Sequence, residues 1–246
     1  MLFPARLLAP WAALALLTRL VPHPPDMDEK GLVAAVPWYP LAGLAVGFCA
    51  VLLPWAGVAS AYPQVQGWMY VLISLWATRG LHWDGLADVA DAWGSGRQGA
   101  EFCSILKDSR IGAFGALALI AGLAVQSLLA GIACAAERWD ALLLAPVAGR
   151  AAAPVLAATC LPHPDSKLGR LVIRGSSIML ALVLVCSFVA ICSFVFSLAK
   201  ALALTAGLTI ILYGLQQIAR RAGGMSGDFF GTTIVLTETV VLAACL

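Results

Sequence analysis

Eight stretches of this chain approach the roughly 20 consecutive apolar residues that a helix needs to cross a bilayer. They are residues 2–21, 37–59, 66–78, 113–136, 139–161, 176–198, 199–219 and 229–246. Hydrophobic residues make up 61% of the sequence and charged residues only 11%, so a soluble domain of this size could not hide its apolar surface. The sequence therefore predicts an all-α, polytopic integral membrane protein, a single membrane domain over residues 1–246 built as a helix bundle of about eight spans.

Basic residues are distributed unevenly between the two sides of this predicted bundle. Eleven of the fifteen Lys and Arg residues lie at connections that follow odd-numbered spans, three lie on the other side, and Arg150 falls inside the fifth span. Cytoplasmic loops of membrane proteins carry an excess of Lys and Arg. We therefore expect the odd-numbered connections to be cytoplasmic and both termini to lie outside.

Charge and cysteine content exclude further classes of function. A net charge of +2, with no run of basic residues, does not favour nucleic acid as a partner. The seven cysteines are scattered and form no CxxC pair, so neither a zinc site nor a disulfide framework is indicated. The apolar N-terminal stretch has no clear small-residue cleavage site, and we interpret it as a first span rather than a removed signal.

Acidic residues gather in one polar segment, residues 80–115, which reads GLHWDGLADVADAWGSGRQGAEFCSILKDSRIGAFG and holds five of the thirteen Asp and Glu residues. Asp84, Asp88 and Asp91 follow one another at i, i+4 and i+7, which places them within about 60° of one another on a helix. Like charges at this spacing repel, so we expect a cation there, and a divalent cation bound by carboxylate oxygens is the simplest candidate. The alternative is a solvated acidic face, as in many soluble proteins. The flanking apolar segments favour a cytoplasmic, Asp-rich helical loop that forms the active site.

Two further polar motifs lie on the same predicted side of the membrane. The first, Lys107-Asp108-Ser109-Arg110, adds basic partners for phosphate close to the three aspartates. The second is the glycine-rich turn of residues 223–228, in which Gly224, Gly227 and Asp228 precede the last span. Such a turn lets backbone N–H groups approach an anion at a helix N-terminus, although glycines also mark ordinary helix breaks.

Ionisable residues inside or beside the predicted spans need a separate explanation. A charged side chain at the bilayer centre costs at least about 2.5 kcal/mol, so it is a functional hypothesis by default. Arg150 is either a structural partner for a carboxylate or a ligand of the substrate, and Glu238 is either its partner or a residue of the site. His82 precedes Asp84 by two residues and is a candidate proton acceptor, although a histidine at a membrane interface is usually not catalytic.

With these motifs in view, the chain resembles the cobalamin synthase (adenosylcobinamide-GDP ribazoletransferase) family of bacteria and archaea. The resemblance begins with LLTRLV in the first span and WYPLAGLAVG at residues 38–47. It is densest at HWDGLADVADAWG and LKDSRIGAFG, and it ends with GGMSGDFFGTTIVLTE, so it covers nearly the whole chain. The order and spacing of the two central motifs inside a multispan protein make it specific.

The resemblance implies a magnesium-dependent enzyme of the cell inner membrane that carries out a late step of cobalamin biosynthesis. The 3′-hydroxyl of α-ribazole, or of its 5′-phosphate, would attack the cobinamide-linked phosphorus of adenosylcobinamide-GDP, and GMP would leave. The active site would face the cytoplasm. The expected partners are the small-molecule substrates, the lipid bilayer and other cobalamin-assembly enzymes.

The division of roles among the residues is our inference from their chemistry and is not carried by the motifs. Asp84, Asp88 and Asp91 would hold Mg²⁺ on the diphosphate, and Lys107 and Arg110 would grip phosphate oxygens. Asp108 and Asp228 would complete a second metal position or activate the hydroxyl. The remaining candidates for substrate binding are His82, Arg150, Gly224, Gly227 and Glu238.

Two alternatives come from other classes of membrane protein. CDP-alcohol phosphotransferases carry a D-G-x-x-A-R motif, but Asp88 stands here where that motif has Ala, and no Arg follows. A cation transporter would distribute its acidic residues over several spans at mid-depth, whereas these gather at one edge beside basic residues. Both alternatives therefore fit the sequence less well.

Overall fold

The structure is a computed structural model that describes the backbone of residues 5–24 and 27–246. This part of the chain is helical, and its only β-type pairing is an isolated bridge between Pro162 and Met225. The elements are α1 (Ala5–Leu17), α2 (Glu29–Ala35), the short 3₁₀ helix η1 (Val36–Trp38), α3 (Tyr39–Trp55), α4 (Pro63–Thr78), α5 (Leu81–Gly94), α6 (Gly99–Leu106), α7 (Ala113–Ala135), α8 (Trp139–Ala157), α9 (Lys167–Arg174), α10 (Ile178–Val195), α11 (Leu198–Arg221) and α12 (Gly227–Ala243). The predicted all-α class is therefore confirmed.

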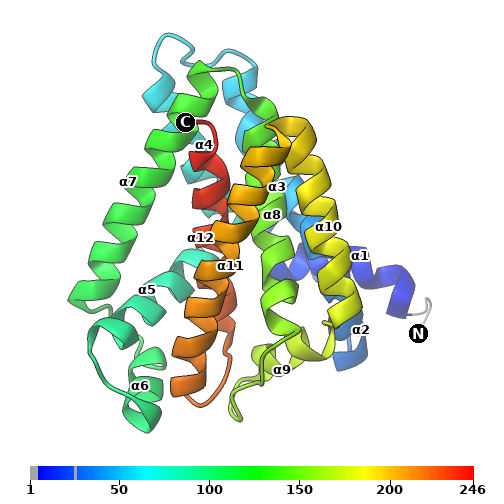
Figure 1. The fold of residues 1–246 in the computed structure, drawn as a ribbon, viewed down its shortest axis with the longest axis vertical. Coiled ribbons are helices and arrows are strands. Elements are labelled where there is room, and N and C mark those ends of the chain that lie inside the picture. The colour runs from blue at the N-terminus through cyan, green and yellow to red at the C-terminus, as the bar shows by residue number, and fades with distance from the viewer. Residues whose placement is uncertain (1–4, 25–26) are drawn as a thin grey trace.

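Within the described part of the chain, five helical segments are long and apolar enough to cross a membrane: the run from α2 to the end of α3, and α7, α8, α10 and α11. The predicted count of eight spans is not confirmed by this measure, because α4 has 16 residues, α12 has 17 and α1 has 13. α1 lies across the other helices rather than along them (Figure 1). The predicted first span began at residue 2, so its first residues lie outside the described part of the chain.

The third predicted span does not run straight into the aspartate-bearing helix. Arg79 and Gly80 both adopt left-handed backbone conformations, with φ of 58° and 69°, and they separate α4 from α5. The chain therefore changes direction at this point, and α5 lies obliquely beside α6 and the lower part of α7 (Figure 1).

Glycines allow the helices of the bundle to pack with their backbones in contact. A Cβ at Gly43 of α3 would collide with the backbone of Pro146 in α8, and one at Gly67 of α4 would collide with the backbone of Ser127 in α7. At Gly85 of α5, the added carbon would lie 2.7 Å from the carbonyl oxygen of Asp228. Small residues give helices in a membrane this close approach. The third of these contacts positions the candidate site.

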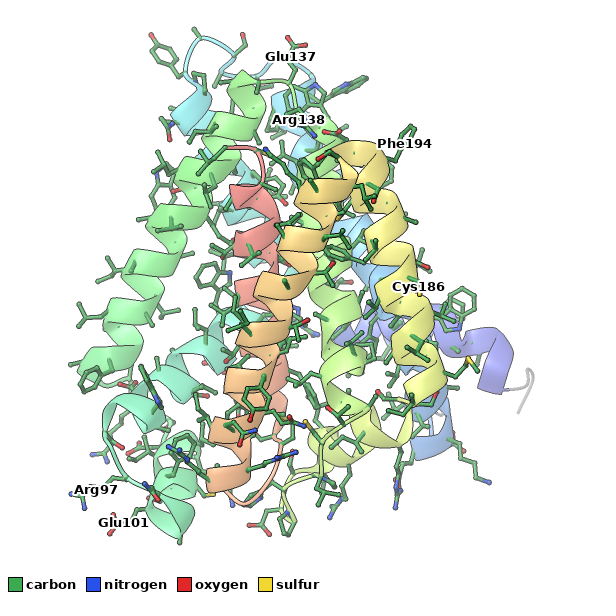
Figure 2. All side chains as sticks on the ribbon, in the orientation of Figure 1. Arg97, Glu101, Glu137, Arg138, Cys186 and Phe194 are labelled. Atoms are coloured by element: carbon green, nitrogen blue, oxygen red, sulfur yellow. The ribbon has the colours of Figure 1, made fainter. Side chains whose placement is uncertain are left out.

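The two short helices α6 and α9 lie at one end of the bundle, which we call the α6–α9 end (Figure 1). This end also carries the end of α11, the beginning of α12 and the turn between them. Figure 2 shows Arg97 and Glu101 at this end and Glu137 and Arg138 at the opposite end. α10 and α11 form a hairpin whose apolar side chains are mostly exposed, as expected for a surface that faces lipid.

Candidate active site

The three aspartates of the sequence motif lie on one helix, as their spacing predicted. α5 runs from Leu81 to Gly94, and its opposite face is buried in the bundle. Asp84 is exposed, whereas Asp88 and Asp91 are half-buried. Because the acidic face is partly covered by protein, it differs from the fully solvated face that was the alternative interpretation.

A fourth carboxylate comes to this face from the other end of the chain. Asp228, in the first turn of α12, lies against Gly85 because the glycine has no side chain. The Thr232 hydroxyl lies 3.0 Å from the carbonyl oxygen of Gly85 and 2.8 Å from that of Asp228, and it ties the two helices together. The Asp228 carboxylate accepts a hydrogen bond of 2.9 Å from the Ser226 hydroxyl.

The pKa of Asp88 is affected both by burial and by the neighbouring carboxylates. Burial raises the pKa of Asp88 to about 7, and the negative charges of Asp84, Asp228 and Asp91 add to the rise. Asp228, which contributes to this rise from α12, is half-buried as well. Carboxylates from α5 and α12 therefore share one partly buried region in which negative charge is not compensated.

Asp91 has a second role that the sequence did not reveal. Its two carboxylate oxygens accept hydrogen bonds of 2.8 Å each from the backbone N–H groups of Gly112 and Gly115, at the start of α7. A Cβ at either glycine would collide with this carboxylate. Asp91 therefore caps a 23-residue helix from outside, where the unpaired N–H groups and the helix dipole favour a negative charge.

The carboxylates suit a hard cation by their chemistry but do not enclose one. Among residues 5–24 and 27–246, no group of three or more His, Cys, Asp or Glu side chains is arranged to hold a metal ion. Mg²⁺ is commonly bound through one or two carboxylates, with substrate phosphates and water completing its coordination. Asp84 and Asp88 fit that pattern, because their oxygens, unlike those of Asp91, accept no hydrogen bond from the described residues.

A cavity of about 310 Å³ opens beside Asp228, between α6, the start of α9 and the turn before α12. We call it the α6–α9 cavity. Its lining combines predicted residues with new ones. The predicted residues are Lys107, Gly224, Gly227 and Asp228, and the polar residues that the sequence reasoning missed are Cys103, His163, Asp165, Ser166, Lys167 and Ser226.

Hydrogen bonds between three distant segments hold the walls of this cavity. Met225 N–H donates to the Leu161 carbonyl at 2.9 Å, and His163 N–H donates to the Met225 carbonyl at 3.0 Å. The Cys103 thiol of α6 donates to the Ala222 carbonyl at 2.9 Å, and its sulfur lies 3.4 Å from His163 Nε2. No local periodicity links such residues, so only the presence of His, Asp and Lys in one Pro-rich loop could have drawn attention to them.

The residues of the charged motif at 107–110 do not all lie at the same place in the structure. Lys107 lines the α6–α9 cavity and forms an ion pair of 2.9 Å with Asp165. Arg110 pairs with Asp108 at 2.7 Å on the surface, and this pairing holds the pKa of Asp108 down to about 2. Neither Asp108 nor Arg110 is among the residues that line the cavity.

Three other candidates lie in the interior of the bundle. Arg150 and Glu238 form a buried ion pair between α8 and α12, and Arg150 also donates to the Pro146 carbonyl at 3.1 Å. The structure shows the ion pair that the structural interpretation predicted, and a role of Arg150 or Glu238 in substrate binding stays a prediction. His82 is 5% exposed and faces away from the aspartates, and burial and the charge of Arg150 hold its pKa well below the ordinary value. None of the three lines the α6–α9 cavity.

These features define an all-helical protein with membrane-spanning segments, whose carboxylates and lysines meet at a polar cavity near one end of the bundle. The chain belongs to the cobalamin-5-phosphate synthase family, whose sequence model matches residues 9–246.

Curated relatives agree with this assignment over nearly the whole chain. An adenosylcobinamide-GDP ribazoletransferase of Nitratidesulfovibrio vulgaris strain DP4 is 44% identical over 239 residues, which cover 94% of this chain and 94% of the relative. The protein of the same name from Chlorobaculum tepidum is 32% identical over 231 residues, covering 88% of this chain and 87% of the relative. One from Brevibacillus brevis is 31% identical over 225 residues, or 87% and 88% of the two chains. No solved structure matches the chain.

Proposed function

We propose that this chain joins adenosylcobinamide-GDP to α-ribazole or its 5′-phosphate, giving adenosylcobalamin or its 5′-phosphate and GMP. The relatives are named for this ribazole transfer, and the family is named for the phosphorylated product. The observation that carries the proposal is the contact between α5 and α12, which brings Asp228 to the Asp84–Asp88 face beside a cavity that contains lysines. Such a site suits the transfer of a phosphate group.

In the proposed reaction the hydroxyl oxygen of the ribazole attacks the phosphorus atom next to cobinamide. One P–O bond forms to the ribazole, the bond between the two phosphates breaks, and the electron pair leaves with GMP. The hydroxyl proton must be accepted during this step. Asp228 is suited to accept it, because its carboxylate lines the α6–α9 cavity and is hydrogen-bonded by only one of the described side chains, Ser226.

We assign Asp84 and Asp88 to Mg²⁺. When bound, the ion would offset the negative charge of the diphosphate and of the leaving GMP. Asp84 and Asp88 would hold it from α5, while Asp91 keeps the start of α7 in place and thereby orients the helix that carries the other two. A direct bond from Asp91 to the metal stays a prediction.

We also propose an orientation in which the α6–α9 end faces the cytoplasm of a cell with an inner membrane. The basic residues support it, because Arg97, Lys107, Arg110 and those of α9 belong to this end, whereas Arg138 lies at the other (Figure 2). α4 packs along α7, and α12 packs along α8, so both also lie within the bilayer. The count of eight spans stays a prediction.

Membranes that contain the chain provide the direct test of this function. Supplied with adenosylcobinamide-GDP, α-ribazole and Mg²⁺, they should form the joined product and release GMP, and removal of Mg²⁺ with a chelator should stop the reaction. Asp84→Asn and Asp88→Asn should each lower turnover at least a hundredfold without lowering the amount of inserted protein, because lost transition-state stabilisation of several kcal/mol corresponds to factors of this size.

Two further variants make this test specific. Asp91→Asn should unfold at a lower temperature, because it loses part of a helix cap, and it should lower turnover less than Asp84→Asn or Asp88→Asn. A loss of turnover as large as theirs would support a direct bond from Asp91 to the metal. Glu101→Gln is the matched control, since Glu101 is an exposed acidic residue at the same end of the bundle, paired with Arg97. Near-normal activity in both Asp84→Asn and Asp88→Asn would remove these residues from the site.

A further inference from the structure

We propose that the α6–α9 cavity is the binding site of the ribazole acceptor, and that Lys167 recognises the acceptor by its 5′-phosphate. This inference rests on the proposed function and extends it to a specificity-determining residue. It states which substrate binds in the cavity and which residue of the protein binds its phosphate.

The size of the cavity favours the smaller substrate. Pockets for small molecules typically measure about 300–1,000 Å³, and this one, at about 310 Å³, lies at the lower limit. A corrin macrocycle is too large for it, so the cobinamide part of the donor must bind elsewhere. A nucleoside phosphate is of the appropriate size.

The charged side chains around the cavity suit the attacking hydroxyl and the 5′-phosphate of the phosphorylated acceptor. The wall from α12 supplies the Asp228 carboxylate, which suits a hydroxyl that must lose its proton. The walls from α6 and α9 supply Lys107 and Lys167, whose ammonium groups suit a phosphate monoester with a charge of about −1.5 to −2. An acceptor bound with its hydroxyl toward Asp228 and its phosphate toward α9 would place each group beside the side chains that suit it.

Lys167 is the lysine that remains available for a ligand. Lys107 forms an ion pair with Asp165, whereas Lys167 has no ion pair and no side-chain hydrogen bond with the described residues. Beside it, the Ser166 oxygen accepts a hydrogen bond of 2.9 Å from Gly169 N–H, which leaves the hydroxyl proton free to be donated to a phosphate oxygen.

The start of α9 is held against the turn that precedes α12. Gly169 packs against the Met225 carbonyl with no room for a side chain, and a Cβ at Gly227 would lie 2.9 Å from the Leu168 side chain. The positive N-terminal ends of α9 and α12 therefore both lie at this cavity, which adds to the attraction of Lys107 and Lys167 for an anion. The site for phosphate is formed by tertiary packing before any ligand binds.

Acceptor kinetics of a Lys167→Gln variant test the proposal. With saturating adenosylcobinamide-GDP, kcat/KM for α-ribazole 5′-phosphate should fall roughly ten- to a hundredfold, the range expected for one hydrogen bond to a charged group, mainly through KM. For unphosphorylated α-ribazole it should change less than twofold. Lys167→Arg should restore most of the loss. Lys30→Gln, at an exposed lysine that lines a different hollow of the same end, should leave both acceptors unaffected.

Other outcomes would overturn the inference without touching the proposed function. If Lys167→Gln weakens both acceptors equally, or weakens neither, Lys167 does not read the phosphate, although the wild-type chain still forms product. If the wild-type chain forms product with neither acceptor, the proposed function itself fails.

Cys103 offers a readout that does not depend on turnover, because its thiol lines the cavity. α-Ribazole 5′-phosphate should slow alkylation of Cys103 by N-ethylmaleimide, as followed by peptide mass spectrometry, and it should not slow alkylation of Cys245, near the C-terminus at the opposite end of the bundle (Figure 1). Protection by GMP in place of the acceptor would assign the cavity to the leaving nucleotide and contradict the inference.

Discussion

At the scale of single residues, the site is organised by carboxylates whose charges are not balanced within the protein. Asp88 is the clearest case, because its half-buried side chain lies among Asp84, Asp91 and Asp228. Asp91 is stabilised by the N–H groups at the start of α7, so repulsion falls mainly on the others. Uncompensated charge of this kind is typical of sites that bind a cation or transfer a proton.

The raised pKa of Asp88 predicts a particular dependence of stability on pH. Its carboxyl has a pKa of about 7 in the folded protein and an ordinary value of 3.8, so the folded state binds the proton more tightly. Protonation of Asp88 therefore makes its full contribution to the free energy of unfolding below about pH 4, and this contribution is lost as the pH rises through 7. In detergent without Mg²⁺, Asp88→Asn should unfold at a higher temperature than the wild type at pH 8, with a difference that disappears near pH 4.

The same unfolding measurement should be repeated with Mg²⁺ added. At pH 8 the ion should raise the unfolding temperature of the wild-type protein, because it offsets the ionised carboxylates, and it should have a smaller effect on Asp88→Asn. Equal melting curves for the two proteins from pH 4 to pH 8 would show that Asp88 titrates normally.

At the scale of helices, the contact between α5 and α12 positions the site. Gly85 and Thr232 bring two segments together that are more than a hundred residues apart in the sequence, and Phe102 of α6 stacks on Phe229 of α12 with ring centres 6.3 Å apart. The beginning of α12 is therefore held between the acidic helix and the wall of the α6–α9 cavity.

Gly85→Ala tests whether this close approach is required. The added methyl carbon would lie 2.7 Å from the Asp228 carbonyl oxygen, and relieving the contact should cost about 1–3 kcal/mol of stability. Because the shift separates Asp228 from Asp84 and Asp88, turnover should fall more than the amount of folded protein. The matched control is Gly207→Ala in α11, where no atom beyond the adjacent residues and backbone of the same helix lies within 4 Å of the added carbon. Full activity of Gly85→Ala would show that the site tolerates a wider spacing.

The helices show how far the sequence could predict this protein. Helical periodicity correctly placed Asp84, Asp88 and Asp91 on one face, and the energetic cost of buried charge correctly suggested that Arg150 and Glu238 could pair. The role of Asp91 as a cap and the contribution of Lys167 depend on which segments meet in space, and periodicity contains no information on that. Hydropathy also could not distinguish a full span from shorter apolar helices such as α1 and α4.

At the scale of the whole molecule, the bundle separates a polar, functional end from a mainly structural one. The described residues form two hydrophobic clusters in it. One surrounds the α6–α9 end and includes Phe229 and Met225, and the other lies toward the opposite end and includes Leu142 and Leu242. α8 and α12 pass through both clusters, and the buried Arg150–Glu238 pair joins these two helices. The site therefore depends on helices that are anchored along most of their length.

This arrangement predicts opposite exposure for the two ends of the bundle in a cell. A protease site inserted after Gln98, between α5 and α6, should be cut in inside-out membrane vesicles and protected in intact spheroplasts, because the positive charges keep this end in the cytoplasm. A site inserted after Glu137, beside Arg138 at the other end, should show the reverse pattern (Figure 2). Retained synthase activity of each insertion variant is the control for correct folding. Cleavage of both sites from the same side would contradict the proposed orientation, in which the α6–α9 end faces the cytoplasm.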